Sequence, residues 1–146
     1  RNSDIVSNLD FAQTFLDIAG VKSPADMQGT SLVPLFKGHT PKDWRTHFYY
    51  HYYEFPGAHS VARHYGVTNG RHKLIHFYQN NEWELFDLKK DPNELQSVYG
   101  NSDYKTIESD LLAELKRLRV HYKVPEEDPV PPKRKRPNQP NRPKKK

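Results

Sequence analysis

The chain has 146 residues, no cysteine and a formal net charge of +5 at pH 7. Without cysteine this segment holds no disulfide, no thiolate nucleophile and no cysteine metal site, and without a run of about 18 apolar residues it holds no membrane span. The positive charge comes from eight lysines and arginines between 133 and 146, so the rest of the chain is slightly acidic and unlike a nucleic-acid-binding surface.

The first residues do not begin with methionine and resemble internal sequence, so we expect the chain to be a piece of a longer protein. Residues 7–19 predict a helix, because apolar side chains recur at helical spacing and Gly20 follows where a helix-ending glycine belongs. Ser7 is the expected N-cap. The apolar stripe is wide, so we expect this helix to be largely buried, against a surface larger than the next elements offer. Its members are Leu9, Phe11, Ala12, Phe15, Leu16, Ile18 and Ala19.

Residues 21–45 are predicted to be mostly connection, because proline and glycine interrupt them repeatedly. One short helical turn is expected at 32–36, capped by Ser31 and ended by Gly38. Trp44 lies near the end of the segment, and we expect its indole to be a packing anchor rather than a ligand platform.

Four strands follow, and two of the turns between them contain residues that accept positive φ. Asn69-Gly70 between apolar runs is a strong hairpin signal, and Asn80-Asn81 marks the next turn. The expected strands are residues 46–55, 60–67, 72–78 and 83–88. His47 and His51 are four residues apart in the first strand, which separates their Cβ atoms by about 13 Å and argues against a shared metal ion.

The third strand carries large apolar groups on both faces, with Leu74 and Tyr78 on one side and Ile75 and Phe77 on the other. A sheet with one solvated face would alternate more cleanly. We therefore expect the sheet to be covered on both sides, by one element of this chain and by a neighbour outside it.

Residues 103–122 predict the clearest helix, capped by Ser102 or Asp103. Apolar side chains form one stripe along it and charged side chains take the opposite face, so this helix is the natural cover for one face of the sheet. The stripe consists of Ile107, Leu111, Leu112, Leu115, Leu118 and Tyr122. A shorter helical turn is expected at 93–99, before Gly100.

Residues 125–146 are dominated by proline and charge, and we expect them to be disordered or loosely extended. Their Lys133–Arg136 run fits a polyanion-binding patch or a targeting signal. A solvated tail is the favoured interpretation, because charge blocks are usually solvated.

Several segments, in order and in register, resemble the C-terminal part of formylglycine-dependent sulfatases. They are residues 4–21, 27–32, 44–45, 64–67, 71–75, 83–88 and 91–94. Their order and spacing look like those of N-acetylglucosamine-6-sulfatases, N-sulfoglucosamine sulfohydrolases and iduronate-2-sulfatases, and the likeness covers residues 4–123. The chain departs from the family pattern at Thr68 and His72, where the family usually has arginine and tyrosine.

The resemblance implies an α+β fold class: a four-stranded antiparallel sheet covered by a C-terminal amphipathic helix, as the last part of an alkaline-phosphatase-like α/β sulfatase. Residues 1–45 would be the end of the catalytic domain and a connection, residues 46–124 the C-terminal subdomain, and residues 125–146 a disordered basic tail. The sheet's second face would then rest on the missing catalytic domain, and family members of this kind are periplasmic or extracellular.

The resemblance also implies which chemistry this segment lacks. Such sulfatases use a formylglycine made from the Cys or Ser of a Cys/Ser-x-Pro-x-Arg motif, together with a calcium ion. This chain has no cysteine and no serine followed two residues later by proline, so we expect no catalytic and no metal-binding residue in it and no activity from it alone. Both groups would belong to the missing N-terminal domain.

By the same resemblance, this segment is expected to form a wall of the pocket for a sulfated sugar. The candidate substrate-binding residues are His59, Arg63 and His64, because arginine and histidine suit an anionic, hydroxyl-rich ligand. The alternative for Arg63 and His64 is hydrogen bonding within the structure or to the catalytic domain. Trp83 is expected to pack in the core rather than stack on a sugar.

Two other function classes compete with the sulfatase assignment. A free-standing carbohydrate- or protein-binding module without catalytic activity would leave the wide stripe of residues 7–19 exposed, which argues against it. A nucleic-acid-binding protein would rest on the basic tail alone, with no recognition motif in the acidic remainder.

Overall fold

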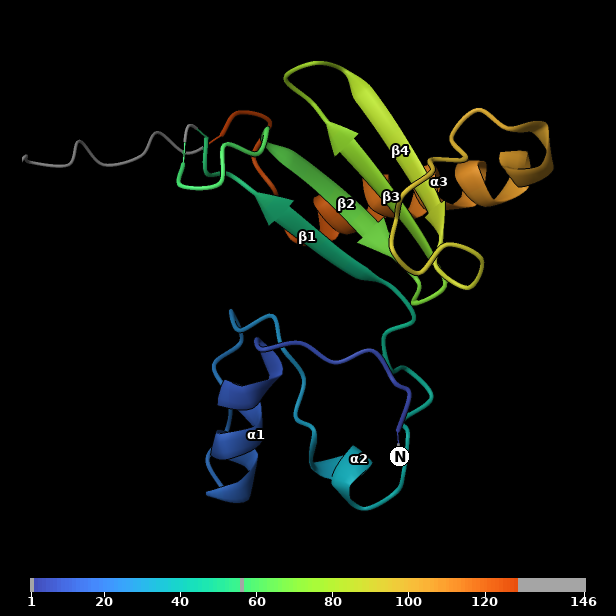
Figure 1. Cartoon of the computed structure of the whole chain (residues 1–146). Coiled ribbons are helices and arrows are strands. Elements are labelled where there is room, and N and C mark those ends of the chain that lie inside the picture. Colours follow the sequence, from blue (N-terminus) through green and yellow to red (C-terminus); the bar gives the residue numbers. More distant parts are fainter. Residues whose placement is uncertain (1, 56, 129–146) are drawn as a thin grey trace, which may run out of the picture.

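The computed structural model describes residues 2–55 and 57–128 (Figure 1). In this part of the chain no helix is long and apolar enough to cross a membrane. The elements are α1 (Asp10–Ile18), α2 (Val33–Phe36), β1 (Phe48–Tyr52), β2 (His64–Thr68), β3 (His72–Phe77), β4 (Glu82–Asp87), the 3₁₀ turn η1 (Ser102–Tyr104) and α3 (Lys105–His121).

The strands form one antiparallel sheet in the order β1-β2-β3-β4, which confirms the predicted meander. The β2–β3 hairpin closes through the Asn69 N–H, which donates to the His72 carbonyl at 3.1 Å, with Gly70 at φ +84°. Asn81, at φ +54°, turns β3 into β4. β2 begins at His64 rather than at residue 60, because Ser60 turns back and donates its N–H to the Gly57 carbonyl.

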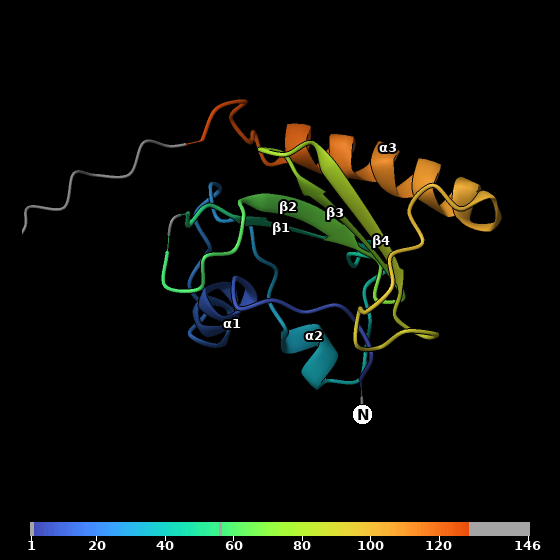
Figure 2. The same ribbon diagram turned by 45° about the horizontal axis from the view of Figure 1, so that its top comes forward.

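Helix α3 covers one face of this sheet, as predicted (Figure 2). The core between them consists of Val67, Leu74, Leu85, Leu111, Leu115 and Leu118, all buried. The chain enters η1 through Asn101, whose side chain accepts the Asp103 N–H at 2.9 Å. The predicted caps, Ser102 and Asp103, are therefore wrong by one or two residues.

The opposite face of the sheet is partly covered by the chain itself, which corrects the expectation that its cover lies wholly outside. Ile75 and Phe86 are buried there. Lys73, on the same face, forms an ion pair with Glu94 at 2.6 Å, so the segment after β4 reaches over the middle strands. On the β1–β2 side of this face the strand residues are half-buried, with Gly66 buried.

Gly66 shapes the β1–β2 side of this face. A Cβ at this position would lie 2.4 Å from the Leu74 carbonyl oxygen and 2.8 Å from the ring of Tyr50, so only glycine lets Tyr50 lie across β2. The sequence motif around residue 66 thus serves the close packing of an aromatic side chain on a strand.

The helical turn predicted at 93–99 is wrong. The Asp91 carboxylate accepts the N–H groups of Leu95 and Gln96, and Glu94 adopts φ +55°, so the backbone cannot continue as a helix. The segment instead runs beside β4, where the Val98 N–H donates to the Leu85 carbonyl at 2.8 Å. This contact covers the outer edge of the sheet.

Helix α1 lies apart from the sheet and packs against α2 and the connection (Figure 1). Its buried side is polar and consists of Asp10, Gln13 and Thr14. Ser7 caps it only indirectly: its N–H donates to the Asp10 carboxylate at 2.7 Å, and its hydroxyl accepts the Leu9 N–H at 3.3 Å. The N-terminal half of the chain is therefore held together by polar contacts.

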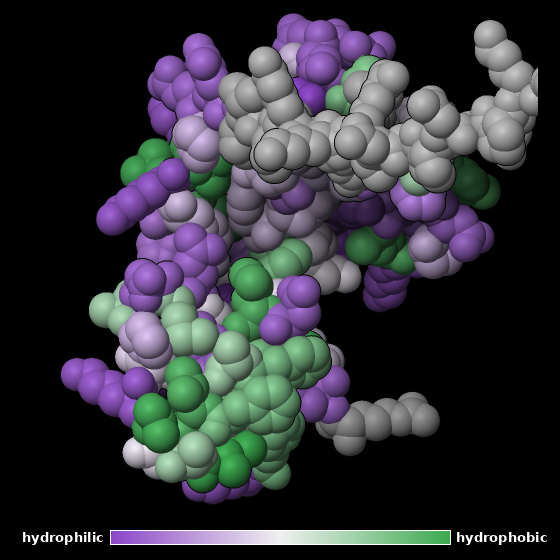
Figure 3. Space-filling model, turned by 90° about the vertical axis from the view of Figure 1, so that its left-hand side faces the viewer, coloured by the Kyte–Doolittle hydropathy of each residue, from purple (hydrophilic) through white to green (hydrophobic). Residues whose placement is uncertain are grey.

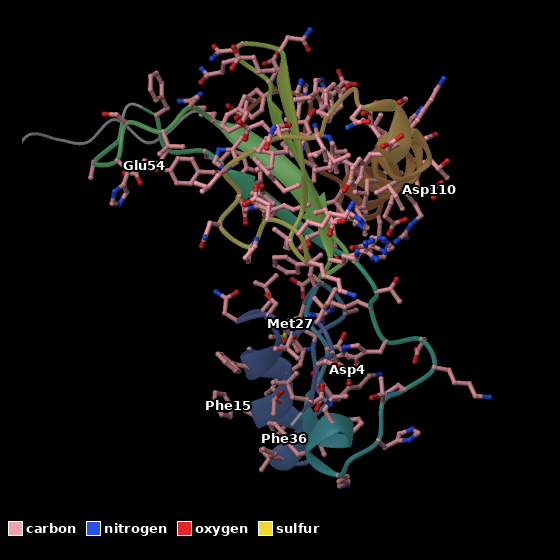
Figure 4. All side chains as sticks on the ribbon, turned by 45° about the vertical axis from the view of Figure 1, so that its right-hand side comes forward. Asp4, Phe15, Met27, Phe36, Glu54 and Asp110 are labelled. Atoms are coloured by element: carbon pink, nitrogen blue, oxygen red, sulfur yellow. The ribbon has the colours of Figure 1, made fainter. Side chains whose placement is uncertain are left out.

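The apolar side of α1 is exposed within this chain, contrary to the expectation that the helix is largely buried. Phe11, Phe15 and Ile18 are 54%, 68% and 67% exposed. Hydrophobic residues gather over the N-terminal part of the molecule in Figure 3, and Phe15 points away from the other elements in Figure 4. A stripe of this kind requires a neighbour that the described residues do not supply.

The connection confirms the short helical turn and the packing role of Trp44, but not the cap that the sequence predicts for the turn. Leu32, not Ser31, is the N-cap of α2, and no side chain caps the helix; the Ser31 hydroxyl accepts the Val33 N–H at 3.2 Å from one position earlier. Trp44 is buried and donates its indole N–H to the Ile5 carbonyl at 3.0 Å, so it anchors the end of the connection to the segment before α1.

Candidate functional site

The three candidate substrate-binding residues lie in or next to the segment that joins β1 to β2. We call residues 53–63 the β1–β2 loop; Pro56 lies outside the described residues. His59 is exposed on this loop, immediately before Ser60, which adopts φ +50°. A non-glycine residue at positive φ is uncommon, and here it accompanies the turn that places His59 at the surface.

His64 begins β2 on the sheet face opposite α3. Its Nδ1 lies 2.8 Å from the Ala62 carbonyl oxygen, so in the neutral ring Nδ1 carries the proton and Nε2 accepts. Its ring stacks on Tyr52 at 5.3 Å between centroids and lies 5.0 Å from Phe77. The imidazole is thus held in one orientation by packing and by one hydrogen bond.

Two tyrosines beside His64 carry hydroxyl groups that sequence reasoning did not single out. The hydroxyls of Tyr50 and Tyr52 are buried and have no hydrogen-bond partner among the described residues. Burial also raises the pKa of Tyr50, so its hydroxyl keeps its proton. The dense aromatic run of residues 48–53 was the available signal, but it did not show which hydroxyls would lack a partner.

The side chain of Arg63 has different partners from that of His64. Its Nη1 forms an ion pair with Asp128 at 3.0 Å, and its Nη2 donates to the Phe55 carbonyl at 2.9 Å. The structure therefore places His59 on the loop and His64 on the sheet face opposite α3, but commits both terminal nitrogens of Arg63 to internal partners. The alternative of internal hydrogen bonding fits Arg63.

Trp83 packs between other aromatic rings and against the core. His76 lies parallel to its ring at 3.8 Å between centroids, and Tyr99 lies nearly parallel to it at 5.9 Å. The predicted packing role of Trp83 is confirmed.

The two departures from the family pattern have structural roles. Thr68 donates its hydroxyl to the His72 carbonyl at 3.0 Å and accepts the Gly70 N–H at 3.1 Å, so it closes the hairpin turn. His72 is buried with its Nε2 3.7 Å from the Asp87 carboxylate, and burial lowers its pKa.

His51 is the histidine with the largest change in acidity. Burial lowers its pKa to about 4, against the opposing effect of the Asp128 carboxylate and with a further lowering by Arg119. Its Nε2 lies 3.3 Å from the Tyr78 hydroxyl. The imidazole therefore stays neutral in the folded protein at neutral pH.

This pKa predicts a pH dependence of stability. The folded-state pKa of His51 lies below that of an unfolded histidine, near 6.5, so its contribution is complete above pH 6.5 and is lost as the pH falls through 4. The wild-type protein should lose unfolding free energy when the pH falls from 7 to 4. We expect this loss to be smaller in His51→Gln, by on the order of 2 kcal/mol. Urea unfolding at both pH values measures this difference, with the exposed His39→Gln as control; equal losses in wild type and His51→Gln would contradict it.

The part of the chain that the structure describes contains no group of three or more His, Cys, Asp or Glu side chains arranged to hold a metal ion. His47 approaches Glu114 at 3.8 Å, whereas His51 lies near Asp128 at 3.7 Å. The described residues thus do not fit the calcium site that the sulfatase resemblance implies for the whole enzyme.

The comparisons with known proteins agree with this arrangement. A family model described as N-sulphoglucosamine sulphohydrolase, C-terminal, matches residues 1–121. The chain is 48% identical over 125 residues to an N-acetylglucosamine-6-O-sulfatase of Bacteroides thetaiotaomicron, covering 84% of this chain and 22% of that protein. It is 33% identical over 122 residues to a Delta 4,5-hexuronate-2-O-sulfatase of the same bacterium, covering 78% of this chain and 23% of that protein.

Solved structures give the same result. One, a complex with its substrate D-glucosamine-2-N,6-O-disulfate, superposes with a TM-score of 0.77 at 47% identity, over 80% of this chain and 24% of the other. A phosphonate monoester hydrolase of Agrobacterium radiobacter superposes with a TM-score of 0.66 at 25% identity, over 83% of this chain and 26% of the other. The α+β fold class is confirmed, and the chain spans about a quarter or less of the length of these relatives.

Proposed function

The chain belongs to the sulfatase family described as N-sulphoglucosamine sulphohydrolase, C-terminal, and we propose that it forms a wall of the substrate pocket in a longer sulfatase that hydrolyses sulfate esters of glycans. The sulfated sugar is its ligand, and the catalytic domain of the same protein is its partner. The names of its relatives support this substrate class, since one is an N-acetylglucosamine-6-O-sulfatase and another binds a disulfated glucosamine.

The observation that carries the proposal is the fixed orientation of the half-buried His64 on the sheet face opposite α3. Its Nδ1 is engaged by the Ala62 carbonyl, which leaves Nε2 for a ligand. Neutral Nε2 accepts a sugar hydroxyl, and protonated Nε2 donates to a sulfate oxygen. His59, exposed on the β1–β2 loop, adds a second polar group.

The division of labour follows from what the residues offer. Formylglycine and calcium supply the nucleophile and neutralise the sulfate oxygens, and we assign both to the catalytic domain outside this chain. The residues of this chain bind and orient the sugar. By family, such an enzyme acts in the periplasm or outside the cell.

The apolar face of α1 supports the same assembly. We propose that residues 1–45 are the end of the catalytic domain with its connection and that residues 46–124 form the C-terminal subdomain. The exposed Phe11, Phe15 and Ile18 then pack against the rest of the catalytic domain, outside this chain. A free-standing binding module would leave this face in water, and nothing in the described residues favours that alternative.

Substitution of the two histidines in the longer sulfatase tests the pocket role. We expect His64→Ala, and to a smaller extent His59→Ala, to raise KM for a sulfated glucosamine about tenfold, equivalent to about 1.4 kcal/mol. The same variants should leave the kinetics of a small aryl sulfate unchanged, because that substrate does not reach the wall.

The exposed His39→Ala variant is the matched control, since His39 lies on the connection after α2. Equal losses on sugar and aryl sulfate, or no loss on either, would count against a sugar-selecting role for this wall.

A further inference from the structure

The C-terminal segment after α3 returns to the β1–β2 loop. Lys123 adopts φ +52°, and the Val124 N–H donates to the Arg119 carbonyl at 2.9 Å, which turns the chain back at the end of the helix. Residues 125–128, expected from the sequence to belong to a loose tail, are thereby placed against the sheet at Asp128; residues 129–146 lie outside the described residues.

Asp128 is held by groups from three separate parts of the chain. Its Oδ2 accepts from Arg63 Nη1 at 3.0 Å and from the Tyr78 hydroxyl at 2.7 Å. Its Oδ1 lies 3.7 Å from His51 Nε2. Burial and the Asp128 carboxylate both raise the pKa of Tyr78, so the tyrosine remains a protonated donor. We call these four residues the Asp128 clasp.

Arg63 extends the clasp to both ends of the loop. It stands at the C-terminal end of the β1–β2 loop, and its Nη2 binds the carbonyl of Phe55 near the N-terminal end. A planar guanidinium serves two acceptors at fixed angles, which a flexible ammonium does not reproduce. Glu54, at the same end of the loop in Figure 4, packs its side chain over Gly57.

We propose that the Asp128 clasp sets the position of the β1–β2 loop, so that Asp128 and Arg63 are positioning residues for recognition of the sulfated sugar. This inference rests on the proposed function of the loop. It assigns Arg63 a role through its neighbours, because its charge is neutralised by Asp128 and is not presented to a sulfate group.

Loss of the clasp has a specific consequence. Removing the carboxylate leaves Arg63 without its ion-pair partner and frees one restraint on the loop that carries His59. The loop then samples more conformations, and the bound geometry must be selected from them, which weakens binding without altering the reacting groups. The expected signature is a rise in KM at nearly constant kcat.

The experiment uses the longer sulfatase with Asp128→Ala, Asp128→Asn and, as matched control, Asp110→Asn on the exposed face of α3 (Figure 4). Two readouts are taken: steady-state kinetics with a sulfated glucosamine and an aryl sulfate, and amide hydrogen exchange of residues 57–63. Asp128→Ala should raise KM for the sugar at least about fivefold, keep kcat and the aryl sulfate kinetics within about twofold, and speed exchange in the loop. Asp128→Asn, which keeps the shape, should show a smaller effect, and Asp110→Asn none.

The outcomes separate this inference from the proposed function. If Asp128→Ala and Asp128→Asn speed loop exchange while His64→Ala leaves the sugar KM unchanged, the clasp holds and the pocket role fails. If His64→Ala raises the sugar KM while neither Asp128 variant alters KM or exchange, the clasp has no positioning role and the inference is overturned. Arg63→Lys, which keeps the charge but not the fork, should raise the sugar KM in the same direction as Asp128→Ala; an unchanged KM would also contradict it.

Discussion

Replacement of Arg45 by alanine should destabilise the N-terminal segment by about 3–5 kcal/mol, because it leaves a buried carboxylate without its cation. Asp10 is fully buried, and its carboxylate accepts hydrogen bonds from both terminal nitrogens of Arg45, at 2.7 and 2.5 Å. Burial opposes ionisation of Asp10, yet hydrogen bonds from Arg45 and the backbone N–H groups of Thr30 and Ser7 hold the pKa of its carboxyl below the usual value.

The same carboxylate joins three parts of the chain, which explains the size of the expected effect. The Thr30 N–H donates to the Asp10 carboxylate at 2.8 Å. The preceding residue must be glycine, since a Cβ on Gly29 would lie 2.1 Å from the Leu9 carbonyl oxygen. Without Arg45 the two backbone donors alone face the charge. Helix α1 and the connection should then separate.

Urea unfolding followed by the fluorescence of Trp44 measures this loss, in a Trp83→Phe background that removes the other tryptophan. The matched control is Arg117→Ala, which breaks the exposed ion pair with Glu114 at 2.7 Å and should cost less than about 1 kcal/mol. Similar losses in the two variants would show that Asp10 is not the polar centre of this segment.

The second large effect concerns the apolar face of α1, and its size should differ between two settings. In the longer sulfatase, the combined Phe11→Ser, Phe15→Ser and Ile18→Ser variant should lose on the order of 5 kcal/mol or more of unfolding free energy, because three large side chains leave the interface that we propose with the catalytic domain. In the 146-residue chain by itself these side chains are exposed, so the same variant should unfold at nearly the wild-type urea concentration and be more soluble.

Val120→Ser is the control for this variant, since Val120 is an exposed apolar residue on α3. It should have little effect on stability in either setting. Destabilisation of the isolated chain by the α1 substitutions, or an unaffected longer sulfatase, would contradict the placement of α1 at an interface.

The sheet and α3 were predictable because their signals are local. Alternating apolar residues indicate the strands, and the Asn69-Gly70 turn indicates a hairpin. Helix α3 has an apolar stripe on one side and charged residues on the other, which indicates that it covers the sheet. The order of the meander then follows from short connections.

The orientation of α1 was not predictable from its own residues. A wide apolar stripe indicates burial, but not the surface that buries it, and in this chain the polar side faces inward instead. The same limit applies to the segment 93–99, where the side chain of Asp91 captures backbone donors that a helix would have used.

Only part of the candidate site could be predicted, because some of its contacts join residues that are far apart in the sequence. His59 and His64 could be named from the family likeness, and the turn at Ser60 makes the exposure of His59 understandable afterwards. The partner of Arg63 could not be named, because Asp128 lies 65 residues away in a stretch that composition marks as a loose tail. Contacts of that range follow from the fold rather than from a pattern.

The central claim is that the apolar face of α1 packs against a catalytic domain outside this chain. Its most direct test is the fluorescence of a hydrophobic dye with the purified 146-residue chain, with its α1 serine variant and with the longer sulfatase. We predict strong dye binding by the chain, because the apolar face of α1 is exposed in it. We predict little binding by the variant, in which this face is polar, and little by the longer sulfatase, in which this face is covered. A chain that binds no dye, or binds it equally after the α1 substitutions, would contradict the claim.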